Sequence, residues 1–152
     1  MQWRTTCLFL ILIGLSFGFA PASLAGEGIN ERPSLYKRLG GYDVIASSVD
    51  NFLERYDNDP ELRQFLGGLN AAESARVRQH FVDYLCERTG GPCLYLGRDM
   101  VKTHEGLSIT DSHYDRVMVH LDDAFTHVGI PAVEKQEMLV MLEALRAETV
   151  GR

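Results

Sequence analysis

The sequence predicts an all-α fold. Beyond residue 33, apolar residues recur at steps of three and four along most of the chain, which is the period of one face of a helix. No segment shows the sustained alternation of apolar and polar residues that marks a half-exposed strand. Glycine or proline interrupts the apolar pattern between successive helices, where a helix is expected to end.

The first two expected helices are followed by turn residues. The segment "PSLYKRLG" forms a short amphipathic helix that Gly40 and Gly41 terminate. A longer helix follows and stops before the Asn58-Asp59-Pro60 turn. Its apolar face consists of Ile45, Val49, Phe52, Leu53 and Tyr56. A brief apolar turn comes next and contains Leu62, Phe65 and Leu66.

Three further helices are expected after this turn. Asn70 can cap the first of them, which ends at the Thr89-Gly90-Gly91-Pro92 turn. Its apolar positions are Val77, Phe81, Tyr84 and Leu85. Thr110 or Asp111 starts the next helix, whose apolar side carries Tyr114, Val117, Met118, Leu121 and Phe125. The last helix follows Pro131 and carries Val133, Met138, Met141, Leu142 and Leu145.

Between Gly91 and Thr110 the helical periodicity is weak. A compact helical domain rarely leaves about eighteen residues so loosely patterned unless they have a function or wrap a ligand. His104 lies in this segment, one helical turn after Met100. The segment is therefore the first place to look for a site.

Residues 1–25 have the features of a secretory signal peptide. Arg4 precedes an uncharged apolar run of fourteen residues, and small residues follow Pro21 at the usual cleavage spacing. The run is too short to span a membrane comfortably, although an uncleaved N-terminal anchor is the alternative. We therefore expect an exported, periplasmic protein without stable membrane insertion after cleavage. Residues 26–33 are then a flexible N-terminal segment, and residues 34–152 form one domain.

The charge of the chain limits its partners. Removal of the leader leaves fourteen basic and twenty-one acidic residues, a formal net charge of −7. Such an acidic chain is a poor partner for nucleic acid and for anionic membrane surfaces.

Two cysteines, Cys86 and Cys93, remain once Cys7 is removed with the leader. The chain has neither a C-x-x-C nor a C-x-x-C-H motif, which excludes the usual zinc and covalent c-type haem signatures. In an exported protein, two thiols seven positions apart are expected to form a disulfide, with two free thiols as the alternative.

The chain has five histidines, and two of them are candidate ligands. We expect His113 and His127 to be solvated and His120 to pack half-buried. His80 shares the apolar stripe of its helix, where a packed core histidine is the ordinary interpretation. If His80 and His104 face the same interior, two neutral imidazoles can hold a flat iron cofactor between them. Otherwise, the helix is rotated and His80 faces solvent.

Several motifs together resemble the group I truncated haemoglobins, the two-over-two helical globins. The similarity runs from about Ser34 to Val150 through "SLYKRLGG", "VDNFLERY", "GGP", "YLGRDMVKTHEGLSIT" and "VGIP". It implies a truncated globin fold that holds haem b without a covalent bond, with His104 as the proximal ligand of the iron. The pocket residues that it implies are Phe52, Leu53, Phe65, Val77, Phe81, Tyr84, Tyr95, Arg98, Met100, Ile109, Tyr114 and Val117.

The distal side departs from the common pattern of the family. Many members carry a Phe-Tyr pair in the second helix, whereas this chain has Phe52-Leu53. A glutamine that is frequent on the third helix is replaced by Phe81. His80 occupies a position where some cyanobacterial members have a histidine, and the resemblance makes it a possible sixth ligand.

The resemblance implies reversible binding of oxygen, nitric oxide or another diatomic gas, as in oxygen transport. A nitric oxide dioxygenase or peroxidase-like side activity is possible, and it would require an unidentified reductase. The alternative function is electron transfer, or redox or gas sensing, by a six-coordinate haem.

Overall fold

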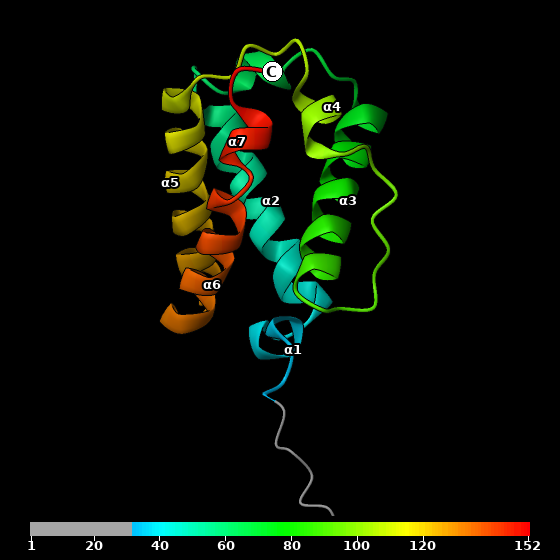
Figure 1. Cartoon of the computed structure of the whole chain (residues 1–152), viewed down its shortest axis with the longest axis vertical. Coiled ribbons are helices and arrows are strands. Elements are labelled where there is room, and N and C mark those ends of the chain that lie inside the picture. The colour runs from blue at the N-terminus through cyan, green and yellow to red at the C-terminus, as the bar shows by residue number, and fades with distance from the viewer. Residues whose placement is uncertain (1–31) are drawn as a thin grey trace, which may run out of the picture. The chain divides into compact units, whose positions relative to one another are not determined.

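The computed structural model describes residues 32–152, which are helical or looped throughout and contain no strand (Figure 1). The all-α prediction is confirmed. The expected signal peptide lies outside the described residues, as does most of the segment 26–33. The elements are α1 (Leu35–Leu39), α2 (Tyr42–Asn58), the 3-10 helix η1 (Arg63–Phe65), α3 (Ala71–Arg88), α4 (Met100–His104), α5 (Asp111–Val128), α6 (Ala132–Glu143) and α7 (Arg146–Thr149).

The helix boundaries follow local capping chemistry. The Asn70 side chain accepts from the backbone N–H of Glu73, and the Glu73 carboxylate accepts from the N–H of Asn70, so a capping box begins α3. Thr110 and His113 form the equivalent reciprocal pair at the start of α5. Gly129 ends α5 with φ of 85°, a left-handed conformation that glycine adopts without steric cost.

The last expected helix is two helices, with Ala144 and Leu145 between them. The Leu142 carbonyl accepts from the Tyr114 hydroxyl at 2.6 Å and from the Leu145 N–H at 3.0 Å. In a continuous α-helix this carbonyl would accept from the N–H of Arg146 instead. A tertiary hydrogen bond therefore accompanies the interruption, which the apolar periodicity of the segment does not reveal.

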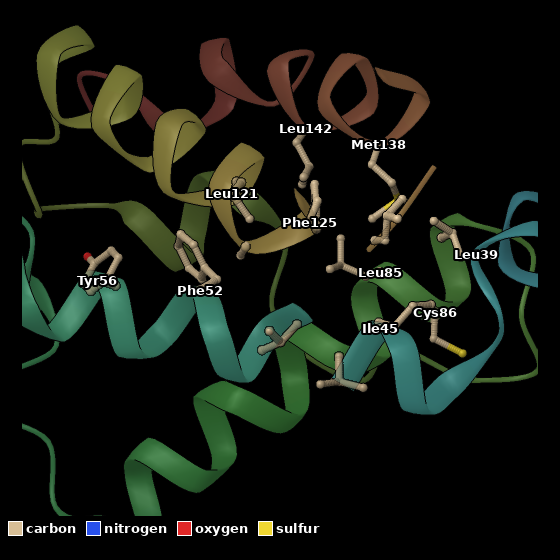
Figure 2. Packing of buried hydrophobic residues seen from close by; sticks show 14 of the residues in the cluster. Leu39, Ile45, Phe52, Tyr56, Leu85, Cys86, Leu121, Phe125, Met138 and Leu142 are labelled. Carbon is tan, nitrogen blue, oxygen red and sulfur yellow. The ribbon is translucent and has the colours of Figure 1, made fainter. Parts of the chain in front are cut away.

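Helix α2 lies at the centre of the domain. It packs against α3 on one side and α5 on the other, α5 packs against α6, and α4 contacts α7 (Figure 1). Figure 2 shows apolar side chains of α1, α2, α3, α5 and α6 meeting in one core. The core residues include Ile45, Val49, Phe52, Val82, Leu85, Cys86, Leu121, Ala124, Phe125, Met138 and Leu142.

The loosely patterned segment contains one short helix. Helix α4 begins where the Asp99 side chain accepts from the N–H of Lys102, and its last residue is His104. Residues 89–99 form an irregular loop between α3 and α4. Among the described residues no helix is long and apolar enough to cross a membrane.

Candidate functional site

His104 is half-buried at the end of α4, and its ring is fixed by the helix itself. Its Nδ1 lies 2.8 Å from the carbonyl oxygen of Met100. A carbonyl can only accept, so Nδ1 carries the proton and Nε2 keeps a lone pair. Metal-binding histidines commonly have this arrangement, in which a backbone carbonyl selects the tautomer and orients the ring. His104 is thus prepared to bind a metal through Nε2.

One stretch of α3 carries Val77, His80, Phe81 and Tyr84, all of them half-buried. Phe81 meets Phe52 of α2 edge-on, with 5.5 Å between ring centroids. Both rings belong to the apolar core or its border. This side of the candidate site is therefore aromatic and aliphatic, with His80 and the Tyr84 hydroxyl as its polar groups.

His80 does not project freely into solvent. Its ring meets the Tyr95 ring edge-to-face, with a centroid distance of 5.9 Å and an interplanar angle of 78°. Tyr95 also contacts Tyr84, with 5.2 Å between ring centroids. The structure thus brings together three of the sequence-predicted site residues, one of them from the loop after α3.

The remaining predicted pocket residues lie in several environments. Tyr114 is buried, its hydroxyl donates to Leu142, and the Arg146 guanidinium lies 4.7 Å from its ring centroid. Burial raises the pKa of Tyr114 to about 12. Phe65 packs edge-on against His113, at 5.0 Å between centroids. Arg98 is exposed, whereas Met100, Ile109 and Val117 are half-buried.

Leu53 and Val77 line a cavity of about 620 Å³ between the end of α2, η1 and the start of α3. Its border is mixed, because it also contains Asp57, Arg63, Gln64 and Ser74 together with Leu66 and Leu69. Leu53 thus borders both the apolar core and this cavity, and Val77 lines the cavity from α3.

Cys86 and Cys93 form a disulfide with an Sγ–Sγ distance of 2.03 Å. Cys86 is fully buried near the end of α3, and Cys93 lies two residues before Tyr95. The bridge thus ties the loop that carries Tyr95 to the helix that carries His80.

Sequence reasoning missed a hydrogen-bonded cluster around the buried Asp59, which follows the end of α2. Asp59 accepts from Nε and Nη2 of Arg116 and from Nε2 of His120, the last at 2.8 Å. These hydrogen bonds hold the pKa of the Asp59 carboxyl well below its usual range, and the bond from Arg116 has the largest effect. The spacing of Arg116 and His120, four residues apart on one helix face, was the available signal, but only the fold shows that Asp59 meets them.

Comparison with known proteins places this site in a family. Residues 34–150 match the model of the bacterial-like globins. A group 1 truncated haemoglobin of Mycolicibacterium paratuberculosis is 34% identical, over 78% of this chain and 85% of that protein. A group 1 truncated haemoglobin of Nostoc is 33% identical, over 70% of this chain and 87% of that protein.

Solved structures agree on the fold. The truncated haemoglobin of Tetrahymena pyriformis superposes with a TM-score of 0.73 at 22% identity, and covers 79% of this chain and 100% of its own. The 2/2 haemoglobin of Synechococcus, crystallised with covalently attached haem, gives 0.71 at 23% identity with the same coverage. At such identities these structures establish the two-over-two globin architecture.

The chain belongs to the bacterial-like globin family, as a group 1 truncated haemoglobin. Its cofactor is accordingly haem b, held without a covalent bond. The chemistry of these residues fits this group, because the Met100 carbonyl orients the His104 ring and leaves Nε2 free of that contact, and α3 carries half-buried apolar side chains. Family membership supports binding of diatomic gases at the haem.

Proposed function

We propose that the protein reversibly binds oxygen, nitric oxide or a similar diatomic gas at a haem whose iron is held by Nε2 of His104. The hydrogen bond between His104 Nδ1 and the Met100 carbonyl carries this proposal, since it leaves one ring nitrogen available and fixes its direction. When bound, haem supplies the gas-binding iron and its one-electron chemistry. The Phe52 and Phe81 rings, which pack edge-on, would make the distal side apolar.

Replacement of His104 tests the proximal assignment. We expect His104→Gly to lose haem retention and the Soret band of the wild type, and added imidazole to restore both by occupying the space of the missing ring. His127→Gly, a change at an exposed histidine near the end of α5, is the matched control and should retain haem. An unchanged Soret spectrum with full haem retention in His104→Gly would contradict the proposal.

The second candidate function is electron transfer or redox sensing by a haem with His80 as its sixth ligand. The half-buried position of His80 between Val77 and Tyr84 on α3 favours it. An incoming gas must then displace His80, so its apparent affinity falls with the fraction of molecules in the open state. We expect His80→Leu to convert a six-coordinate ferrous spectrum into a five-coordinate one and to speed gas binding. A wild-type ferrous protein that is already five-coordinate and high-spin argues against this candidate.

Catalytic conversion of nitric oxide to nitrate is a more specific proposal than gas binding. Nitric oxide and oxygen, with one electron from ferrous iron, give nitrate, and a separate reductase must then restore the ferrous state. Nitrate formed when nitric oxide is added to the oxygen-equilibrated ferrous protein tests this reaction. A yield below one nitrate per haem in the first turnover would argue for a binding role alone.

We also propose that the protein is exported, because a signal-like leader precedes a domain that holds a disulfide. Intact mass of the protein from the periplasmic fraction should show loss of the leader after Ala25. Alkylation should modify Cys86 and Cys93 only after reduction. A retained leader would favour the membrane-tethered alternative, and two thiols alkylated without reductant would contradict an oxidising location.

A further inference from the structure

The loop between α3 and α4, residues 89–99, presents one aromatic ring to α3. Tyr95 is half-buried, whereas its neighbours Leu94 and Leu96 are 66% and 77% exposed. The alternation shows that this stretch is extended, with Tyr95 directed inward. Tyr95 is therefore the point at which the loop contacts the α3 residues of the candidate site.

Several contacts fix the Tyr95 ring in this position. Its backbone N–H donates to Oε1 of Glu87 at 3.2 Å, and its hydroxyl donates to the Arg98 carbonyl at 2.7 Å. Gly97 lies directly beneath the ring, because a Cβ there would lie 2.3 Å from Cζ of Tyr95. The loop is thus folded around Tyr95.

The disulfide anchors this loop to the core. Cys86 is fully buried six residues after His80 on α3, and Cys93 lies two residues before Tyr95. Since Cys86 cannot move without disturbing the core, the bridge limits how far Tyr95 can move away from α3. The disulfide is therefore one of the contacts that hold the Tyr95 ring near His80.

We infer that Tyr95 is a positioning residue for His80, and that the Cys86–Cys93 disulfide makes this positioning sensitive to thiol reductants. This inference rests on the proposed distal role of His80. The His80 ring has two competing partners, the Tyr95 ring and the iron. The intact bridge holds Tyr95 in place and favours the first partner, which lowers the fraction of molecules in which His80 ligates the iron without abolishing it. Reduction of the bridge weakens the ring contact and increases the ligation of iron by His80.

The chemistry of the switch is ordinary thiol–disulfide exchange. Two thiols of a reductant lose two electrons and two protons and form their own disulfide, while the bond between Cys86 and Cys93 breaks and each sulfur gains a proton. The reductant is a dithiol of the class that periplasmic or extracellular oxidoreductases present. Reoxidation of the pair reverses the change.

Ring substitutions at Tyr95 provide the first test. We expect Tyr95→Ala to raise the six-coordinate fraction of the ferrous haem spectrum and to slow carbon monoxide association about two- to tenfold, the range of a lost aromatic contact. Tyr95→Phe, which retains the ring but loses the hydroxyl bond to the Arg98 carbonyl, should lie between the wild type and Tyr95→Ala. In the His80→Leu background, Tyr95→Ala should leave coordination unchanged. An Ala variant that behaves like wild type, or a shift that persists without His80, overturns the inference.

The second test acts on the bridge. A phosphine reductant should shift the wild-type spectrum in the same direction as Tyr95→Ala and should leave a Cys93→Ala variant, already shifted, unchanged. If the wild-type spectrum stays unchanged after the disulfide has been reduced, with the reduction verified by alkylation of both thiols, the proposed role of the disulfide is overturned. If His80→Leu changes coordination but Tyr95→Ala does not, only this inference fails. If no variant shows ligation by His80, its proposed distal role fails as well.

Discussion

The resemblance to truncated haemoglobins pairs Leu53 with the tyrosine that many of them carry in the second helix. Leu53 is half-buried on α2 and lines the cavity of about 620 Å³, so its side chain has space to grow. The neighbouring Phe52 and Val77 are apolar and cannot replace the missing donor. Because residue 53 is a leucine, His80 is the principal polar side chain among the proposed distal residues.

We therefore predict that Leu53→Tyr slows oxygen dissociation about tenfold, because a new hydrogen bond contributes about 1–1.5 kcal/mol. The measurement is the oxygen dissociation rate of the ferrous protein by rapid mixing. Leu53→Phe adds the same ring without a hydroxyl and is the matched control. Equal rates in the Tyr and Phe variants would show that the hydroxyl does not reach the bound gas.

At the scale of single elements, α3 matters most, because it carries the distal face and Cys86. Its beginning depends on the capping box of Asn70 and Glu73, and its end on the turn that starts at Thr89. The cap therefore fixes where α3 begins.

Removal of this cap should destabilise the domain without changing the site chemistry. We predict that Asn70→Ala lowers the free energy of unfolding by about 1 kcal/mol, since the N–H groups of Ala72 and Glu73 lose their acceptor. Urea denaturation of the haem-bound protein measures the loss. Asn70→Asp keeps an acceptor at the same place and should stay close to wild type. A stable Ala variant would show that solvent satisfies these groups equally well.

At the scale of the whole molecule, Asp59 links the end of α2 to the middle of α5. Its side chain is only 5% exposed, and it accepts from Arg116, His120 and the N–H of Glu61. A carboxyl whose pKa is lower in the folded than in the unfolded chain stabilises the fold above its ordinary pKa. This stabilisation is lost as the pH falls from about 4 toward the lower folded value.

We predict that Asp59→Asn costs about 2 kcal/mol of stability at pH 7, the range of a hydrogen bond to a charged group. The difference from wild type should narrow below about pH 4, where protonation of Asp59 begins to remove the same charge. Urea denaturation at pH 7, 5 and 3 measures both effects. Asp57→Asn, at an exposed position, should have little effect at any pH. A constant difference across this range would mean that packing rather than charge explains the loss.

Most of the fold could be predicted from the sequence, because helix periodicity and capping are local properties. The beginnings of α3 and α5, the end of α2 and the weak helicity around His104 followed from nearby residues alone. The break between α6 and α7 could not be predicted, because it involves a hydrogen bond from Tyr114, some twenty-eight positions away. The family resemblance supplied haem, which no spacing of histidines establishes.

The sequence by itself determined the helices, the candidate ligands and the cysteine pair, since each is a matter of residue type and short spacing. The tertiary structure alone decided which of these groups meet. It placed the Tyr95 ring on His80, Asp59 between Arg116 and His120, and Tyr114 against α6 rather than free in a pocket. Such contacts depend on how the helices pack against one another in space, and local periodicity carries no information about that packing.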